Sequence, residues 1–196
     1  MSCISKFSNS AGVLYFVPEA YFAGHQRNRR MPAEVIFTAV KTPHEVARVA
    51  ELAGIIWKEH YIPIIGKPQV DYMLEHFQSA PAIEKQLAEG VFYFLIQQED
   101  LDLGYLAFEK RAVSLFLSKI YLLESKRGMG YGRTAMAFVE NSARNMECAE
   151  IALTVNKYND QSINTYTRMG FSKKGGEITD IGGGFVMDDY RMVKPL

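Results

Sequence analysis

The sequence predicts an α/β protein in which helices cover both faces of a mixed, mostly antiparallel central β-sheet. Short stretches rich in β-branched, aromatic and long apolar residues recur along most of the chain and are typical of strands. Other stretches place apolar residues three and four positions apart, as helices with one buried face do. Polar or glycine-rich turns join several successive strands, which favours antiparallel neighbours. Alternation of strands with helices then gives a layered domain.

The elements can be assigned from residue 35 onward. Strands are predicted at residues 35–40, 91–96, 103–108, 114–123, 151–156, 171–178 and 185–193, and helices at 42–57, 69–77, 81–89, 134–147 and 160–169. The first helix begins where Thr42 supplies an N-cap, Pro43 takes the first helical position and Glu45 completes a capping box. Trp57 continues the apolar face of this helix, so we expect it in the core.

The segment 58–68 is predicted to be an irregular connector. Pro63, Gly66 and Pro68 interrupt it, and proline both removes a backbone donor and crowds the preceding turn. We therefore expect the first helix to end before this segment.

A glycine-rich loop lies between the strand at 114–123 and the helix that follows it. Gly128, Gly130 and Gly132 fall within five residues. Glycines let backbone N–H groups approach a ligand closely, and the free amides at a helix N-terminus favour phosphate oxygens. The pattern therefore indicates an anion site.

The spacing of these glycines selects among phosphate motifs. No Lys-Ser or Lys-Thr follows them, which excludes the P-loop pattern. The dinucleotide fingerprint would need a third glycine where Arg133 stands. The spacing from Arg127 to Gly130 to Gly132 instead resembles the pyrophosphate loop of the GNAT superfamily of N-acetyltransferases.

A second motif supports the resemblance. Asn159 is followed seven residues later by Tyr166, and then by Gly170 and Phe171, which is similar to a motif of the same family. Asn159 or Asp160 is also a good helix N-cap, and Gly170 suits the position beyond a helix end. The two motifs lie about 30 residues apart, as one helix and one strand require. The resemblance covers roughly residues 35–196.

The resemblance implies acetyl-CoA as co-substrate and no metal. It implies that main-chain groups of the loop hold the pyrophosphate, that main-chain groups of the preceding strand pair with the pantetheine arm, and that one of these strand amides polarises the thioester carbonyl. The sheet must then open between the strands at 114–123 and 151–156. The implied cofactor-binding residues are Ile120, Tyr121, Leu122, Arg127, Gly128, Met129, Gly130, Tyr131, Gly132, Arg133, Asn159 and Tyr166. Asn159 could equally serve only as a helix cap.

The resemblance also implies that Tyr166 acts as the general acid that protonates the departing thiolate. A core tyrosine is the alternative. Some family members carry a basic glutamate on a central strand, but the strands here offer only Lys119 and Thr154. Glu59 and His60 are the candidates for the base, and Tyr61, Glu124 and water are further possibilities.

The expected acceptor is a primary amine of a small molecule, such as a polyamine. Carboxylates that could surround a cationic amine are Glu59, Asp71, Glu75, Asp188 and Asp189, although solvated surface charges are the simpler interpretation. A peptide amine and an antibiotic amine are alternative acceptors. A non-catalytic acyl-CoA-binding module and a nucleotide-binding oxidoreductase are alternative functions.

Composition narrows the class of protein. The 196 residues carry 22 basic and 22 acidic side chains, so a net charge of zero gives no reason to expect a nucleic-acid partner. No apolar stretch has the length of a membrane span. Two cysteines, Cys3 and Cys148, are too far apart in sequence to suggest a metal site, and this usage suits the cytoplasm. Cys148 is expected to pack in the core, and a homodimer is compatible with the sequence.

The first 30 residues differ in texture from the rest. Their positive charge follows the apolar part instead of preceding it, which is unlike a signal peptide. We expect an N-terminal extension over residues 1–30 and a single acetyltransferase domain over residues 31–196.

Overall fold

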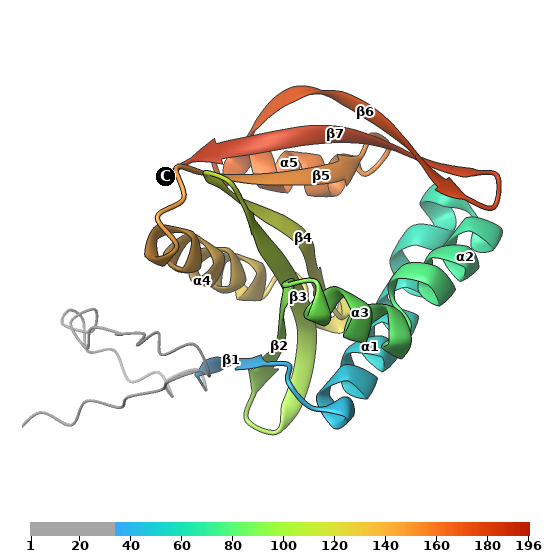
Figure 1. Cartoon of the computed structure of the whole chain (residues 1–196), viewed down its shortest axis with the longest axis horizontal. Coiled ribbons are helices and arrows are strands. Elements are labelled where there is room, and N and C mark those ends of the chain that lie inside the picture. Colours follow the sequence, from blue (N-terminus) through green and yellow to red (C-terminus); the bar gives the residue numbers. More distant parts are fainter. Residues whose placement is uncertain (1–33) are drawn as a thin grey trace, which may run out of the picture. The chain divides into compact units, whose positions relative to one another are not determined.

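The computed structural model describes residues 34–196, and the predicted extension lies outside these described residues. Within them the chain forms one seven-stranded sheet with the strand order β1-β2-β3-β4-β5-β7-β6 (Figure 1). The strands are β1 Val35–Ala39, β2 Phe92–Gln98, β3 Leu101–Arg111, β4 Ser114–Leu122, β5 Glu150–Asn156, β6 Ser172–Gly182 and β7 Phe185–Pro195. All neighbours are antiparallel except β4 and β5, which are parallel. The predicted fold class is confirmed.

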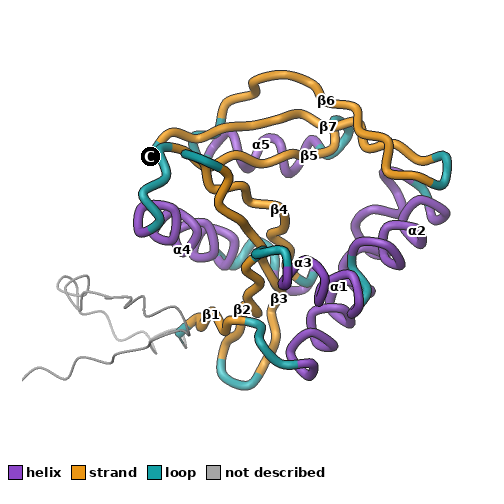
Figure 2. Tube along the Cα trace, in the orientation of Figure 1, coloured by secondary structure: helices purple, strands orange, loops and turns teal. Residues whose placement is uncertain are grey.

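Helices cover both faces of the sheet (Figure 2). They are α1 Pro43–Ile65, α2 Lys67–Phe77, α3 Ala80–Ala88, α4 Tyr131–Asn145 and α5 Asp160–Arg168, with a short 3₁₀ turn at Glu124–Lys126. The first three pack on one face and the last two on the other, so each face has its own apolar core. The two-residue period of β3 shows the division, because Leu106 and Phe108 join the α4 core while Tyr105 and Ala107 join the α1 core. Cys148 and Trp57 are buried in these cores, as predicted.

The predicted start of α1 is confirmed in detail. Thr42 Oγ1 accepts the backbone N–H of Glu45 at 3.3 Å, and Glu45 Oε2 accepts the N–H of Thr42 at 2.8 Å. The reciprocal bonds satisfy donors that a helix start leaves free.

The predicted irregular connector at residues 58–68 is wrong. The helix α1 continues through Pro63 to Ile65, and α2 begins at Lys67. Pro63 lies in the last turn of α1, where its missing N–H removes a single helical bond close to the end. Tyr61 packs against Trp57 with ring centroids 4.5 Å apart, which holds this turn against the core. The chain bends only at Gly66, whose φ of 81° suits glycine.

The sheet opens between β4 and β5, as predicted. These strands pair only over Ser114–Phe116 and Glu150–Ala152, and beyond these residues they separate. A bulge in β4 adds to the divergence, because the register with β3 shifts at Ser118, whose hydroxyl donates to the carbonyl of Ala107 at 3.1 Å. The second half of β4 therefore has an edge without a neighbouring strand.

The β6–β7 hairpin reaches over this opening to α2. The hydroxyl of Tyr72 donates to the carbonyl of Ile181 at 2.8 Å, and Gln69 Nε2 donates to the carbonyl of Val186 at 2.7 Å. We call these two contacts the hairpin–α2 contact. Figures 1 and 2 show the hairpin spanning from β5 to α2.

Candidate active site

A cavity of about 810 Å³ occupies the opening between β4 and β5. On one side of the sheet its wall comes from the glycine loop, α4 and α5, and on the other side from α1, α2, β6 and β7. The side chains of β5 alternate between the α4 core and the cavity. Ile151 and Leu153 face the core, Ala152, Thr154 and Asn156 line the cavity, and Val155 belongs to both. Two ligands can therefore enter from opposite faces and meet at the strand edge.

The glycine loop forms an anion site at one end of this cavity. Among the described residues, no backbone N–H from Gly128 to Gly132 has a protein acceptor. Gly128 and Gly130 have φ values of 76° and 93°, which turn the loop toward the start of α4. Arg127 lines the cavity and its Nε donates to the carbonyl of Leu122 at 3.1 Å. The free amides and the helix start fit the oxygens of a pyrophosphate.

The structure separates the predicted loop residues into two groups. Arg127, Gly128 and Gly132 line the cavity, whereas Met129, Gly130, Tyr131 and Arg133 do not. Met129 is 64% exposed, and Arg133 is exposed on the first turn of α4. The hydroxyl of Tyr131 donates to Gln98 at 2.7 Å. These residues can contribute backbone groups to the anion site, although none of them lines the cavity.

The predicted pantetheine strand lines the cavity. One edge of the segment 120–122 pairs with β3. The other edge has no neighbouring strand, because β4 pairs with β5 only over residues 114–116. Its free main-chain groups suit an extended ligand that adds itself to the sheet.

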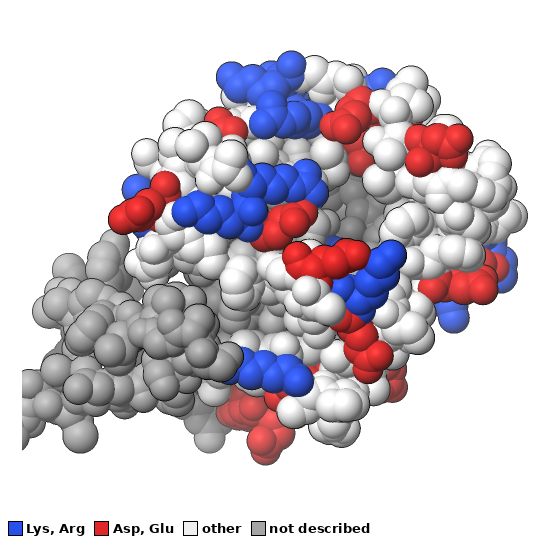
Figure 3. Space-filling view, viewed as in Figure 1, with Lys and Arg blue, Asp and Glu red and all other residues white. Residues whose placement is uncertain are grey.

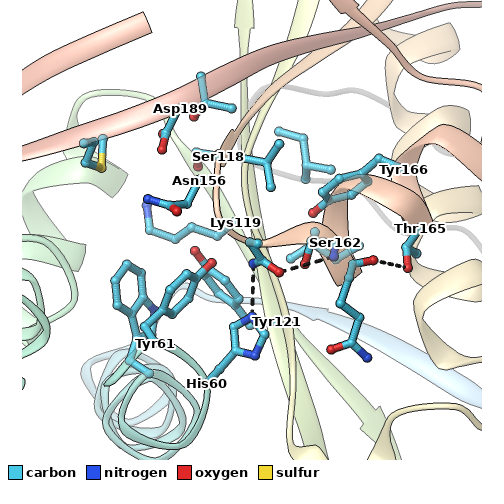
Figure 4. Close-up of a pocket in the computed structure, with 18 of the residues that line it drawn as sticks. His60, Tyr61, Ser118, Lys119, Tyr121, Asn156, Ser162, Thr165, Tyr166 and Asp189 are labelled. Atoms are coloured by element: carbon cyan, nitrogen blue, oxygen red, sulfur yellow. Dashed lines mark hydrogen bonds between the residues drawn. The ribbon is translucent and has the colours of Figure 1, made fainter. Parts of the chain in front are cut away.

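Tyr166 reaches the cavity from α5 (Figure 4). Its ring packs edge-on against Phe171, with centroids 5.6 Å apart. Burial raises the pKa of the Tyr166 hydroxyl, and the nearby Tyr61 raises it further. The phenol is therefore protonated at neutral pH and able to donate.

His60 and Asn159 connect α1 to α5 at the cavity wall. Asn159 Oδ1 accepts the backbone N–H of Ser162 at 3.2 Å and caps α5, while its Nδ2 lies 3.0 Å from His60 Nε2. His60 Nδ1 lies 3.3 Å from a guanidinium nitrogen of Arg127. Burial, followed by the Arg127 charge, lowers the pKa of His60. Asn159 Nδ2 and the Arg127 guanidinium can both only donate, and a neutral imidazole has a single acceptor nitrogen. Whichever ring nitrogen accepts, it already faces one of these donors, so neither is free to take a proton from a substrate.

A sequence model of the acetyltransferase (GNAT) family matches residues 49–171. The chain belongs to the GNAT family of acetyltransferases. It is an N-acetyltransferase whose co-substrate is acetyl-CoA.

Solved structures share the fold of this acetyltransferase. The PaiA N-acetyltransferase of Thermoplasma acidophilum, solved in complex with coenzyme A, is 16% identical, with 83% of this chain and 99% of that chain covered and a TM-score of 0.69. The ribosomal-protein-S18-alanine N-acetyltransferase of Escherichia coli is 14% identical, with 83% and 94% covered and a TM-score of 0.62. A GCN5-related N-acetyltransferase of Rhodopseudomonas palustris is 12% identical, with 88% and 100% covered and a TM-score of 0.69. No curated protein matches the sequence.

Most of the predicted acidic residues do not line the cavity of the acetyltransferase. Glu59 is exposed and does not line the cavity, so the structure does not bring this candidate base to the site. Glu124, Asp71, Glu75 and Asp188 also lie outside the cavity wall. Asp71 forms an ion pair with Lys67, and Asp188 forms one with Lys157. Asp71, Glu75 and Glu124 are surface charges, and Asp188 is a partly buried residue of β7.

Asp189 is the predicted carboxylate that does line the cavity. It lies on β7 opposite Asn156 of β5 and is 8% exposed. Burial raises the pKa of Asp189 to about 6, while a hydrogen bond from Thr154 acts in the opposite direction. A carboxylate with this pKa is ionised at neutral pH and still basic enough to accept a proton.

Lys119 is a second buried charge in the acetyltransferase cavity. It lies on β4 directly after the bulge, is 8% exposed, and burial lowers its pKa to about 8. The sequence places Lys119 on a central strand, where some family members carry a basic glutamate, but it does not predict that Lys119 lines a cavity. Strand alternation was the signal available for its facing direction, but the bulge at Ser118 reverses that alternation.

Two further findings concern metals and membranes. Residues 34–196 contain no group of three or more His, Cys, Asp or Glu side chains placed to hold a metal ion. In the same residues, no helix is both long enough and apolar enough to cross a membrane. On the face shown in Figure 3, basic and acidic side chains are interspersed.

Proposed function

We propose that this acetyltransferase moves the acetyl group from acetyl-CoA directly to the primary amine of a small molecule. The observation that carries the proposal is the cavity through the sheet. It joins the anion site to a second part of the cavity, lined by α1, α2, β6 and β7, which we call the acceptor chamber. A concave chamber of this kind suits a small acceptor better than a folded protein surface.

The chain would hold acetyl-CoA through main-chain groups at two places. The free amides of Gly128 to Gly132 would bind the pyrophosphate, with the α4 N-terminus adding a favourable dipole. The free edge of β4 at Ile120 to Leu122 would pair with the pantetheine arm, and one amide there would polarise the thioester carbonyl. Acetyl-CoA supplies the activated acyl group.

Two side chains would move the protons. Asp189 would accept the proton from the acceptor amine, because it is buried in the acceptor chamber and its pKa is raised to about 6. Tyr166 would donate its hydroxyl proton to the sulfur as the C–S bond breaks. The raised pKa of Tyr166 makes this transfer unfavourable unless it is concerted with bond cleavage, where the sulfur gains negative charge. Figure 4 shows the two side chains entering the cavity from β7 and α5.

Polyamines receive limited support as the acceptor class. Of the five carboxylates that the sequence offered, Asp189 lines the cavity, and the structure adds Glu177 of β6, which is exposed. Glu177 pairs in register with Asp189. One buried and one exposed carboxylate can bind a single ammonium group.

An amine panel assayed by thiol release from acetyl-CoA tests the proposal. We expect turnover with at least one small primary amine, and with that amine Tyr166→Phe should lower kcat by about 10²–10⁴-fold with nearly unchanged acetyl-CoA affinity. Phenylalanine keeps the ring packing on Phe171, so melting temperature serves as the control. Turnover restricted to peptide amines would contradict the small-molecule acceptor. Normal kcat in Tyr166→Phe, with chemistry rate-limiting, would contradict the acid role.

A further inference from the structure

Lys119 presents a buried ammonium group to the acceptor chamber. Its Nζ donates to Gln86 Oε1 at 2.8 Å and lies 5.1 Å from the centre of the Tyr93 ring. Gln86 is itself fixed, because the same oxygen accepts the Tyr93 hydroxyl at 2.8 Å and its Nε2 donates to the carbonyl of Phe77 at 3.0 Å. The ammonium is therefore held in one place on the cavity wall.

Among residues 34–196, the Lys119 ammonium has spare donors and forms no ion pair. The charge of Glu109 raises the pKa of Lys119, but burial has the larger effect and lowers it. The ammonium has three N–H groups, and among residues 34–196 only Gln86 accepts one of them. The other buried charge of the chamber, Asp189, makes no ion pair or hydrogen bond with Lys119 within these residues. Burying two opposite charges apart from each other is costly in free energy. A protein that needed only packing here could use an apolar residue of similar length.

The two charges lie on facing walls of one chamber. Lys119 extends from β4, and Asp189 projects from β7 across the opening (Figure 4). Figure 4 also shows the Lys119 side chain pointing away from Tyr166. An acceptor that reaches both groups must offer a cation to one and an anion to the other.

We propose that Lys119 binds an anionic group of the acceptor, so that the preferred acceptor is an amine that also carries a carboxylate. The inference rests on the proposed function and names the substrate class of the same site. The amine of the acceptor lies toward Asp189, and its carboxylate takes the spare donors of Lys119 in charge-assisted hydrogen bonds. A polyamine would instead place a second cation against Lys119, which is unfavourable.

Matched acceptors test this selectivity. Linear ω-amino acids and the diamines of equal chain length differ only in the terminal group, and their kcat/KM can be compared by thiol release. For wild type we expect at least about a ten-fold preference for the best amino acid over its matched diamine, the scale of one charge-assisted contact. Equal use of the two compounds, or a preference for the diamine, overturns the inference.

Variants of Lys119 identify the cause of the preference. Lys119→Gln should remove the preference, Lys119→Arg should retain it because the cation remains, and Lys119→Glu should reverse it in favour of the diamine. Lys85→Gln is the matched control. It removes the same charge, but Lys85 is exposed on α3, one residue before Gln86. An unchanged preference in Lys119→Gln overturns the inference. Acetyl-CoA affinity shows that each variant is folded, and if one variant fails this check the other two decide.

Equilibrium binding separates this inference from the proposed function. Calorimetry with the coenzyme A-bound protein measures affinity for the same compounds without turnover. If wild type binds an ω-amino acid that Lys119→Gln does not bind, yet no small amine is acetylated, the carboxylate site stands and the small-molecule acetylation fails. If no compound of either series is bound or acetylated, the inference is overturned.

Discussion

At the scale of single residues, Asp189 and Lys119 are the two charged side chains that residues 34–196 bury, and both line the cavity. Charges are buried at a cost unless they are paired. Neither residue has an ionic partner close enough to offset that cost, so both are better explained by a substrate than by stability. This is the pattern expected where a protein gives up stability for function.

Asp189→Asn should lower kcat/KM by about 10²-fold or more and remove the acidic limb of its pH profile. The carboxylate must be ionised to accept a proton, so wild-type activity should rise as pH increases through about 6. Burial raises this pKa the most; Asp188 and Glu177 also raise it, while Thr154 and Lys157 lower it. Kinetics from pH 5 to pH 8 check the prediction.

Asp188→Asn is the control for this measurement. Asp188 is adjacent in sequence and ion-paired to Lys157, and it does not line the cavity. It should keep the acidic limb, with a modest shift. An acidic limb near pH 6 that persists in Asp189→Asn would remove Asp189 from the proton path.

Lys119→Met should stabilise the protein at neutral pH. Because the pKa of Lys119 falls from 10.5 to about 8 on folding, the unfolded chain binds more protons between these values, and stability rises with pH across that range. Below pH 8 the full cost of burying the charged ammonium lowers the free energy of unfolding. Removing that cost should gain on the order of 1–3 kcal/mol, once the loss of the hydrogen bond to Gln86 is subtracted. Urea unfolding at pH 7 and pH 10 should show a gain that shrinks at the higher pH. A less stable variant at pH 7 would contradict the argument.

The sequence identified part of the site residue by residue. Arg127, the glycines and Tyr166 follow from local spacing, and Arg127, Gly128, Gly132 and Tyr166 line the cavity. Asp189 was one of five carboxylates with equal claims, because a side chain on a strand near the surface gives no local sign of burial. Its burial depends on the pairing of β7 between β5 and β6, which is a property of the sheet.

At the scale of elements, α1 shows where local signals mislead. Two prolines and a glycine predicted a connector, but tertiary packing of Tyr61 on Trp57 and Tyr121 keeps the last turn helical. The consequence is functional, because the continued helix brings His60, Tyr61 and Ile65 to the cavity wall. Helix starts were more predictable, since a capping box depends on residues three positions apart.

Gly183→Ala should disturb the hairpin–α2 contact and raise KM for the acceptor. Gly183 has a φ of 63°, and a Cβ there would lie 2.7 Å from Cε2 of Tyr72. Moving the Tyr72 ring breaks its hydrogen bond to Ile181, which should loosen the β6–β7 hairpin that lines the acceptor chamber. We expect KM for the acceptor to rise about three- to ten-fold, a loss of about 1 kcal/mol in binding, with unchanged acetyl-CoA affinity.

Gly184→Ala separates backbone strain from the contact. Gly184 has a φ of 79°, and a Cβ there would meet nothing within 4 Å. Both variants carry the strain of an alanine in the left-handed region, but only Gly183→Ala displaces Tyr72. Equal KM values for the two variants would show that the contact does not govern acceptor binding.

At the scale of the whole described structure, the sheet consists of two parts that meet at three residue pairs. The sequence predicted the strand positions and the antiparallel turns, because these depend on local patterns. The opening between β4 and β5 followed only from family resemblance, since no local pattern marks where two strands separate. The cavity arises from this separation, so its position depends on the fold of the whole sheet. Only the glycine loop at the anion-binding end of the cavity can be recognised from a local motif.

We infer that acetyl-CoA occupies the opening between β4 and β5 with its pyrophosphate on the glycine loop. The most direct test is calorimetric titration of acetyl-CoA into Gly130→Asp and Gly90→Asp. These glycines have φ values of 93° and 94°, and a Cβ at either meets nothing within 4 Å, so strain and added charge are matched. Only Gly130 lies at the start of α4, beside the free amides.

We expect Gly130→Asp to bind acetyl-CoA at least about 100-fold more weakly than wild type, because a carboxylate facing phosphate costs several kcal/mol. Gly90→Asp should bind like wild type. Equal affinities for the two variants, with both folded, would contradict the placement of acetyl-CoA on this loop.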